Sequence, residues 1–312
     1  MAYHPGMRWH FRAWVGVWLG VVCGLQAAQT FRVATYNLEN YLLESVGTRP
    51  AKSEAARAKI RESLRAVNAD VVALQEVGGT PALLELRGTL EREGLSYPHW
   101  ELVHGWDTNI QVAVLSKFPL VARRPHTNES FLLQGRRFSV SRGFAEVDVQ
   151  VNAGYQFTLF TAHLKSRRVV PDADEAELRQ QEGLLLRQKV DARLAGHPNA
   201  NLLVAGDLND TKDSLSTRAV LGRYSAKLVD TRPAERNGDN QPSPNPRYDP
   251  RHITWTHFYG KEDTYSRIDY ILLSRGMARA WQPAESYVLA LPNWGVGSDH
   301  RPVVATFTAE DL

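Results

Sequence analysis

The stretch "NLLVAGDLND", residues 201–210, joins an apolar run to a glycine and a group of oxygen-bearing side chains. The run "LLVA" is typical of a buried strand. After a turn expected at Gly206, the chain presents Asp207, Asn209 and Asp210 within four residues. These residue types are common where strands stop, but carboxylate and amide oxygens are also the ligands of Mg²⁺ and Ca²⁺. The stretch therefore predicts a strand and leaves the role of its polar end open.

Seven further apolar runs predict strands. They cover residues 31–37, 70–77, 111–116, 143–151, 157–164, 267–274 and 302–308. Continuous runs such as "VVAL" are typical of strands that are covered on both faces. The alternation of apolar and polar residues in 143–151 is typical of a half-solvated strand.

Helical periodicity appears in three segments between these strands. Residues 53–67 carry an apolar stripe, and Ser53 precedes it as an expected N-cap. Residues 173–196 begin with acidic side chains, and 81–92 form a third expected helix. Residues 232–252, rich in Pro, Asn and charge, are expected to be a long surface loop. The pattern predicts two sheets packed together with helices outside.

The N-terminus has the features of a secretory leader. Two arginines within the first twelve residues precede the uncharged apolar segment 13–25, and small residues follow it. We expect a signal peptide over 1–28, with cleavage near Ala27 or Ala28 and export to the periplasm or the medium. A membrane anchor formed by an uncleaved leader and a cytoplasmic location are the alternatives. The remaining residues, 29–312, are expected to form one domain.

Composition limits the chemistry of the protein. The 312-residue chain has a formal net charge of +3, so it is not a general binder of polyanions, and nucleic acid would need a local basic surface. Cys23 is the only cysteine and lies in the leader. A processed chain would therefore lack disulfides, and any metal site would use oxygen and nitrogen ligands.

Polar residues recur at the ends of the expected strands in six short motifs. In chain order, these are "TYNLEN", "LQEV", "TAHLKS", "AGDLND", "RIDYIL" and "SDHRPV". Each polar residue has an ordinary explanation when it is taken alone: a turn amide, a solvated strand end, a core histidine, or an Asp269–Arg267 ion pair. Taken together, the six motifs predict that their polar residues lie at one rim of the two sheets.

This ordered set resembles the endonuclease/exonuclease/phosphatase superfamily, which includes pancreatic-type deoxyribonuclease, apurinic-site endonucleases, inositol polyphosphate phosphatases and neutral sphingomyelinases. The resemblance extends over about residues 31–308, and the motifs stand in the order of the family. It implies an α/β fold, a four-layer sandwich in which two central mixed β-sheets pack face to face with helices outside. It also implies that 29–312 is a single catalytic domain with its active site at the edge of the sheets.

The resemblance implies a metal-dependent hydrolase of phosphate esters. Its metal ligands would be Glu76, Asn37 and Asp299, with orientation of His300 as the alternative role of Asp299. The ion would be Mg²⁺, with Mn²⁺ or Ca²⁺ as alternatives. Asp207 would orient or deprotonate the attacking water, and Asn209 would donate its amide to the phosphate.

The remaining roles are implied in the same way. His300 and Asp269 resemble the His–Asp pair of the family, in which a carboxylate fixes the imidazole tautomer and raises its pKa. His163 resembles a second histidine that contacts a phosphate oxygen. Arg142 and Lys165 would bind the substrate, although Arg142 could also be a surface charge.

The sequence departs from pancreatic-type deoxyribonuclease at one position. Those enzymes place a glutamate as the partner of the first histidine, in a segment that corresponds to "DTNIQVAVLS". Here the segment offers only Asn109 or Gln111. The departure weakens the analogy to deoxyribonuclease but not the resemblance to the superfamily.

The sequence predicts the class of reaction more specifically than it predicts the substrate. We expect an endonuclease or exonuclease on DNA or RNA, because basic residues follow two strand ends and "WTHFY" could stack on bases. The basic residues are Arg136, Arg137, Arg142, Lys165, Arg167 and Arg168. The alternatives are a phosphatase or phospholipase-C-like hydrolase of inositol phosphates or sphingolipid head groups, and a non-catalytic binding protein. No obligate protein partner is evident.

Overall fold

The computed structural model describes residues 1–3, 28–235 and 254–309. Most of the expected leader and most of the expected loop at 232–252 fall outside the described residues. Within the described part of the chain, no helix is long and apolar enough to cross a membrane.

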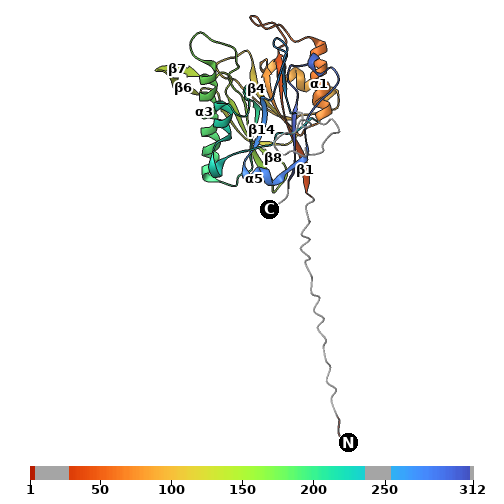
Figure 1. Cartoon of the computed structure of the whole chain (residues 1–312). Helices are drawn as coiled ribbons and strands as arrows, with labels where there is room; N and C mark the ends of the chain where they lie inside the picture. Colours follow the sequence, from red (N-terminus) through yellow and green to blue (C-terminus); the bar gives the residue numbers. More distant parts are fainter. Residues whose placement is uncertain (4–27, 236–253, 310–312) are drawn as a thin grey trace, which may run out of the picture.

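Two six-stranded sheets form the centre of the protein (Figure 1). The first contains, in spatial order, β15 (Trp281–Val288), β16 (Val303–Ala309), β1 (Gln29–Tyr41), β2 (Val71–Val77), β4 (Gln111–Ser116) and β3 (His99–Val103). The second contains β11 (Val229–Asp230), β14 (Asp269–Leu273), β10 (Leu202–Asp207), β9 (Gln156–His163), β8 (Phe144–Gln150) and β5 (Leu120–His126). Both sheets are mixed, because β1 pairs with β2 and β9 with β10 in parallel, whereas the other pairs are antiparallel.

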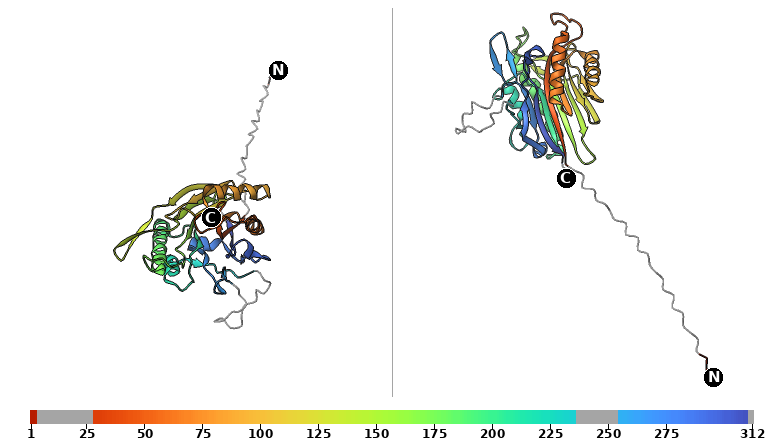
Figure 2. Two further views of the ribbon diagram at one scale, coloured as in Figure 1. Left: turned by 90° about the horizontal axis from the view of Figure 1, so that it is seen from above. Right: turned by 90° about the vertical axis from the view of Figure 1, so that its right-hand side faces the viewer.

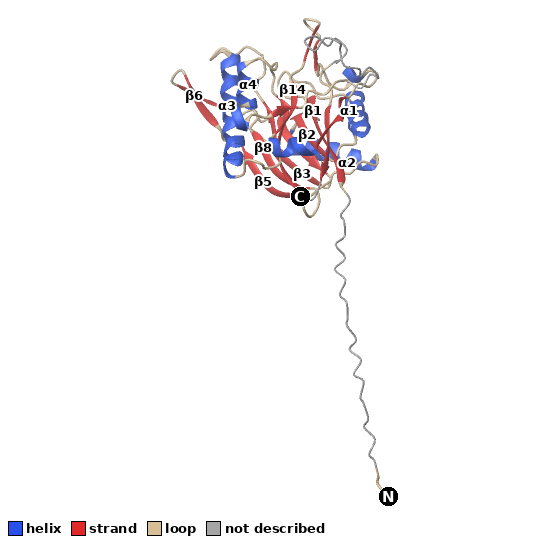
Figure 3. Cartoon of the chain, turned by 60° about the horizontal axis from the view of Figure 1, so that its bottom comes forward, coloured by secondary structure: helices blue, strands red, loops and turns tan. Residues whose placement is uncertain are grey.

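The two sheets pack face to face, and helices cover their outer faces. Apolar side chains from both sheets, such as Phe31, Val147 and Ile271, meet in the buried core between them. The outer helices are α1 (Glu54–Val67) and α2 (Gly79–Arg92) on the first sheet, and α3 (Glu175–Gly196) and α4 (Leu215–Leu221) on the second. Figures 2 and 3 show the helices on both sides of the strands. The four-layer α/β sandwich expected from the sequence is confirmed.

Smaller elements lie around these layers. They are α5 (Arg275–Ala280), the two short 3₁₀ helices Tyr224–Ala226 and Trp294–Val296, and the hairpins β6 (Ser130–Leu133) with β7 (Arg136–Ser139) and β12 (His257–Tyr259) with β13 (Thr264–Ser266). The hairpin β12–β13 is joined to the loop before β16, because the amide of Phe258 donates to the carbonyl of Asp299. This junction places the hairpin beside the strand ends that carry the sequence motifs.

The capping interactions explain where two helices begin. The Ser53 side chain accepts a hydrogen bond from the amide of Ala56, as expected for the N-cap of α1. Asp174 caps α3 by accepting from the amides of Ala176 and Glu177. The predicted helix 53–67 is confirmed within one residue at its start.

Two local expectations are wrong. The chain does not turn at Gly206, because β10 continues through Asp207, and Gly206 instead permits a close approach of β9. A Cβ atom on Gly206 would lie 2.0 Å from the carbonyl oxygen of Ala162. Strand β8 is not half-solvated, because the carboxylate of Glu146 is buried and pairs with Arg124 and Arg193 beneath α3.

Candidate active site

The register of the second sheet aligns three of the candidate residues. In this register Asp207 pairs with His163 on β9 and with Asp269 on β14. All three side chains are buried. Because neighbouring strands are about 4.8 Å apart, this register alone brings two acids and an imidazole to one edge of the sheet.

Glu76 reaches the same edge because β2 is irregular at its end. Its backbone is left-handed, with φ of 65°, and the pairing of β2 with both neighbours shifts register at this point. Such bulges turn a side chain away from the alternation of a regular strand. The preceding residue, Gln75, keeps the regular orientation and bonds to Thr161 of the other sheet. Glu76 therefore lies at the rim while Gln75 links the two sheets beneath it.

The side chain of Asn37 connects Glu76, a candidate metal ligand, to Asp207 of the second sheet. Its side-chain nitrogen donates to Glu76 Oε1 at 3.3 Å and to Asp207 Oδ2 at 3.0 Å. His163 Nε2 lies 3.5 Å from Asp207 Oδ2 and 3.8 Å from Glu76 Oε1. Four residues from four strands, up to 170 positions apart, thus form one cluster.

His300 forms a buried pair with Asp269. Its Nδ1 lies 2.8 Å from Asp269 Oδ2, and its Nε2 faces Asp207 at 3.8 Å. The hydroxyl of Thr256 donates to Asp269 Oδ2 at 2.6 Å, and the amide of His300 donates to the hydroxyl of Ser298. These contacts fix the orientation of the imidazole. Arg267, a sequence-based partner for Asp269, pairs with another carboxylate instead.

Thr256 and Ser298 were missed as site residues in the sequence analysis. Ser298 also donates to the carbonyl oxygen of Asn37, so it joins the loop before β16 to the end of β1. Both residues are buried beside ionisable groups. Ser298 opens the motif "SDHRPV" and Thr256 lies outside the six motifs, and a hydroxyl residue at either kind of position is too common to identify it.

The surroundings shift the pKa values of the two histidines in opposite directions. Burial lowers the pKa of His163 well below its usual value, and the nearby Arg142 lowers it further. Burial would also lower the pKa of His300, but the carboxylates of Asp269, Asp207 and Asp299 outweigh it and raise the pKa well above its usual value. In the absence of a bound metal ion, these shifts favour the imidazolium form of His300 and the neutral form of His163.

Asp207 has a perturbed pKa of its own. Burial, together with the charge of Asp269, raises the pKa of Asp207 to about 7, although His300 and hydrogen bonds from Asn209 and Asn37 oppose the shift. A carboxylate with such a pKa can exchange a proton near neutral pH. This property suits a group that orients or deprotonates water.

The donor set at the rim fits a hard divalent cation. Glu76 offers two carboxylate oxygens, and its side chain is 17% exposed, which leaves room for water ligands. Asn40, which donates its backbone amide to Glu76, has a buried side-chain oxygen without a hydrogen-bond partner among the described residues. Glu76 therefore supplies oxygens that Mg²⁺ accepts. Asn37 turns its side-chain nitrogen to Glu76, and its Oδ1 accepts from the amide of Glu39, so it would become the expected ligand only after its amide group turns over.

The proposed substrate-binding residues differ in their placement. Arg142 is buried and not a surface charge; it donates to the carbonyl oxygen of Leu164, and its Nε has no partner among the described residues. Asn209 donates its side-chain nitrogen to the same carbonyl at 3.0 Å. Lys165 does not join the cluster through any described contact, because its ammonium donates to two backbone carbonyls in its own loop.

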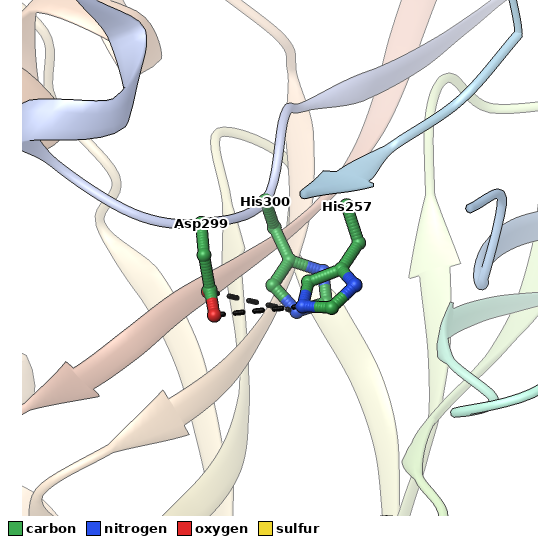
Figure 4. A group of neighbouring side chains, drawn as sticks. All are labelled: His257, Asp299 and His300. Atoms are coloured by element: carbon green, nitrogen blue, oxygen red, sulfur yellow. Dashed lines mark ion pairs between the residues drawn. The ribbon is translucent and has the colours of Figure 1, made fainter. Parts of the chain in front are cut away.

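Asp299 contacts imidazoles rather than Glu76 in this structure. Its carboxylate lies 3.5 Å from His257 Nε2 and 3.8 Å from His300 Nε2 (Figure 4). His257, on β12, was expected only as a base-stacking residue, yet its ring centroid is 4.6 Å from that of His300. The sequence could not reveal this contact because His257 lies outside the six motifs and 43 positions before His300.

The departure from pancreatic-type deoxyribonuclease concerns the ring partner of His163, which is the first of the motif histidines along the chain. Its Nδ1 is buried and has no hydrogen-bond partner among the described residues. Gln111 donates its side-chain nitrogen to Thr108, and the amide of Asn109 donates to Asp107. Neither residue replaces the glutamate that the deoxyribonuclease analogy would require.

Comparisons with known proteins identify the family of the chain. The family model described as "Endonuclease/Exonuclease/phosphatase family" matches residues 34–300. The chain therefore belongs to the endonuclease/exonuclease/phosphatase family. A search of curated protein sequences finds no match.

Solved structures show the same fold. The human Nocturnin catalytic domain with bound sulfate has 18% identity and a TM-score of 0.61, covering 90% of this chain and 98% of its own. Sphingomyelinase C from Streptomyces griseocarneus has 19% identity and a TM-score of 0.56, with 89% and 99% covered. A beta toxin mutant from Staphylococcus aureus with bound magnesium ions has 15% identity and a TM-score of 0.58, with 89% and 99% covered. At these identities the likeness establishes the fold alone.

Proposed function

We propose that the protein is an exported, divalent-metal-dependent phosphodiesterase that cleaves nucleic acid. The observation that carries the reaction class is the convergence of Asn37, Glu76, His163, Asp207 and the Asp269–His300 pair at one rim. Family membership supports phosphoester hydrolysis. Export is proposed from the leader-like sequence of the first 28 residues.

In this proposal the chain positions a phosphodiester between two groups of residues. Glu76 and Asn37 would hold Mg²⁺, which when bound supplies positive charge beside the phosphate oxygens. Asp207 orients the attacking water and accepts its proton, as its pKa near neutrality allows. His300, kept protonated by Asp269, donates from Nε2 to the phosphate or the leaving oxygen. Neutral His163 and the buried Arg142 donate to the non-bridging oxygens.

A groove beside this cluster supports a nucleic acid substrate. It has a volume of about 760 Å³ and reaches from Asp299 along the hairpin β12–β13 to the short helix at Trp294. Aromatic residues dominate its lining: Trp255, Phe258, Tyr259, Tyr265 and Trp294. Aromatic rings next to a phosphate site are the usual platform for unpaired bases. The groove therefore favours a single-stranded or locally unpaired substrate.

Charges in the groove argue against recognition of a cationic head group. Each of its two carboxylates has a basic side chain as neighbour, since Glu39 lies 3.5 Å from the Lys52 ammonium and Asp299 lies 3.5 Å from the His257 imidazole. The Arg301 guanidinium covers the ring of Trp255, with 3.3 Å between its central carbon and the ring centroid. The face of Trp255 that Arg301 covers is therefore closed to a quaternary ammonium group.

The basic rim expected from the sequence is partly neutralised. Arg136 pairs with Asp172 at 3.0 Å, and Arg167 pairs with Asp210 at 3.2 Å. Exposed pairs of this kind exchange partners readily and contribute little to stability. Phosphate recognition is therefore proposed to depend on the rim residues and the aromatic groove more than on a continuous basic surface.

A substrate panel tests the proposal. The purified protein would be offered single-stranded DNA, RNA, plasmid DNA, bis(4-nitrophenyl) phosphate, inositol phosphates and sphingomyelin, with Mg²⁺ and with a chelator. We expect Mg²⁺-dependent cleavage of the aryl diester and of at least one nucleic acid. Hydrolysis of monoesters without diesters, or of sphingomyelin alone, would contradict the nuclease assignment.

A further inference from the structure

A second group of ligand atoms lies beside the proposed magnesium site. His257, Asp299 and His300 come from β12 and from the loop before β16, and their ligand atoms lie within 4.8 Å of one another. Figure 4 shows the carboxylate facing both imidazole rings. The backbones of His257 and His300 also form a β-bridge, so the two rings are held together by the fold.

Two distances in this group are close to those between the ligands of a tetrahedral metal site. Two ligand atoms that are each about 2.1 Å from Zn²⁺ lie about 3.4 Å apart in tetrahedral geometry. The carboxylate of Asp299 lies 3.5 Å from His257 Nε2 and 3.8 Å from His300 Nε2. The ring nitrogens of the two histidines lie within 4.8 Å of each other.

The outer contacts of both imidazoles match those of metal-binding histidines. A ligating histidine usually uses its second ring nitrogen to donate to a nearby acceptor, which fixes the ring and its tautomer. His300 Nδ1 faces Asp269 at 2.8 Å, and His257 Nδ1 faces the hydroxyl of Ser266 at 3.4 Å. Each ring therefore presents Nε2 to the same carboxylate.

We propose that His257, Asp299 and His300 form a second metal site that binds a borderline ion such as Zn²⁺. Two imidazoles and one carboxylate suit Zn²⁺, whereas the oxygen donors around Glu76 suit Mg²⁺. The side chain of Asp299 is 38% exposed, so water or a substrate oxygen can complete the coordination. The two sites differ in donor type and do not share Glu76.

The site has a consequence for His300. A metal ion on Nε2 replaces the proton at that atom, so Zn²⁺ binding and proton donation by His300 exclude each other. This consequence rests on the proposed function, whereas the metal site itself does not. Zn²⁺ binding is therefore measured directly, without a substrate.

The test is a Zn²⁺ titration against a chromogenic chelator, in excess Mg²⁺, on protein without a polyhistidine tag. We expect one Zn²⁺ per chain in the wild type and in Glu76→Gln, which lacks the Mg²⁺ carboxylate. His257→Gln should lose at least about tenfold in affinity. His197→Gln, which removes an exposed histidine after α3, is the matched control and should bind as the wild type does.

Asp299→Asn provides a second variant of nearly the same shape and should also lose at least about tenfold. Thermal unfolding would show that each variant remains folded. Equal Zn²⁺ affinity in His257→Gln, Asp299→Asn and His197→Gln would overturn the site. Loss of Zn²⁺ binding in Glu76→Gln alone would overturn it too, because the ion would then occupy the oxygen site.

Discussion

His300 Nδ1 and Asp269 Oδ2 lie 2.8 Å apart in the buried rim of the sandwich, although the residues are 31 positions apart in the chain. Because this carboxylate and its neighbours keep the imidazole protonated, the pair links the fold directly to the proposed chemistry. The same rim holds Glu76 and Asp207, joined through the side chain of Asn37.

Asp269→Asn should change the pH dependence of turnover. The carboxylate raises the pKa of His300, so a proton donor at this position stays active as the pH rises above about 6.5. Without that charge the pKa of His300 falls, and the basic limb of the pH profile should move to lower pH. Hydrolysis of bis(4-nitrophenyl) phosphate measured across pH would show the shift. An unchanged basic limb would mean that His300 is not the donor.

Gly206→Ala should destabilise the protein strongly. The added Cβ would lie 2.0 Å from the carbonyl of Ala162, where β9 and β10 approach each other. We expect a loss of about 3 kcal/mol or more in the free energy of unfolding, measured with urea. Gly88→Ala is the control, because Gly88 lies in α2 with no atom within 4 Å of the new Cβ, and should stabilise by about 0.5–1 kcal/mol. Equal stability of the two variants would contradict the close approach of the strands.

Glu146→Gln should reduce stability at neutral pH. Pairing with His126, Arg124 and Arg193 outweighs burial and lowers the pKa of Glu146 to about 2. The stabilisation is present above pH about 4.5 and is lost as the pH falls toward 2, because only the ionised carboxylate pairs with the cations.

Urea unfolding at pH 7 should show a cost of about 2 kcal/mol for Glu146→Gln, less than for a fully buried pair because Arg124 and Arg193 are partly exposed. The difference from the wild type should shrink near pH 2. Glu62→Gln, which removes an exposed partner of Lys59, should cost less than about 1 kcal/mol. A Glu146→Gln variant as stable as Glu62→Gln at pH 7 would rule out the buried network.

Tyr265→Ala should weaken binding of single-stranded substrate. Tyr265 is 57% exposed in the aromatic groove, and its ring contacts those of Trp255 and Phe258. One lost stacking platform should raise KM for an oligonucleotide about 5-fold to 100-fold and leave turnover of bis(4-nitrophenyl) phosphate unchanged. Tyr265→Phe should retain binding, and Tyr224→Ala, at an exposed tyrosine outside the groove, serves as the control. An unaltered KM in Tyr265→Ala would remove the groove from the binding site.

The sequence predicted most of the fold because its signals are local. The strand at 111–116 and the helix at 53–67 follow from apolar periodicity and from the cap at Ser53, which need no tertiary information. The turn expected at Gly206 was wrong because a glycine in a strand can also serve a close approach of two backbones. The prediction that β8 is half-solvated was wrong because the cations that pair with Glu146 and allow its burial lie on β5 and α3.

Only the site residues that stand in the six motifs could be predicted from the sequence. The residues that the register aligns, such as Asp207 and Asp269, stand in short recognisable motifs. Thr256 and His257 stand outside the six motifs, and their roles depend on where the hairpin β12–β13 docks against His300. Contacts of this kind arise from tertiary structure and have no local sequence signal.

The central claim is that these residues act around one divalent cation held by Glu76. The most direct test is the rate of bis(4-nitrophenyl) phosphate hydrolysis against Mg²⁺ concentration in Glu76→Gln, with Glu62→Gln as control and thermal unfolding to verify the fold. We predict that Glu76→Gln remains folded and loses activity by on the order of 100-fold or more at saturating Mg²⁺. Wild-type activity with an unchanged Mg²⁺ dependence in that variant would contradict the account.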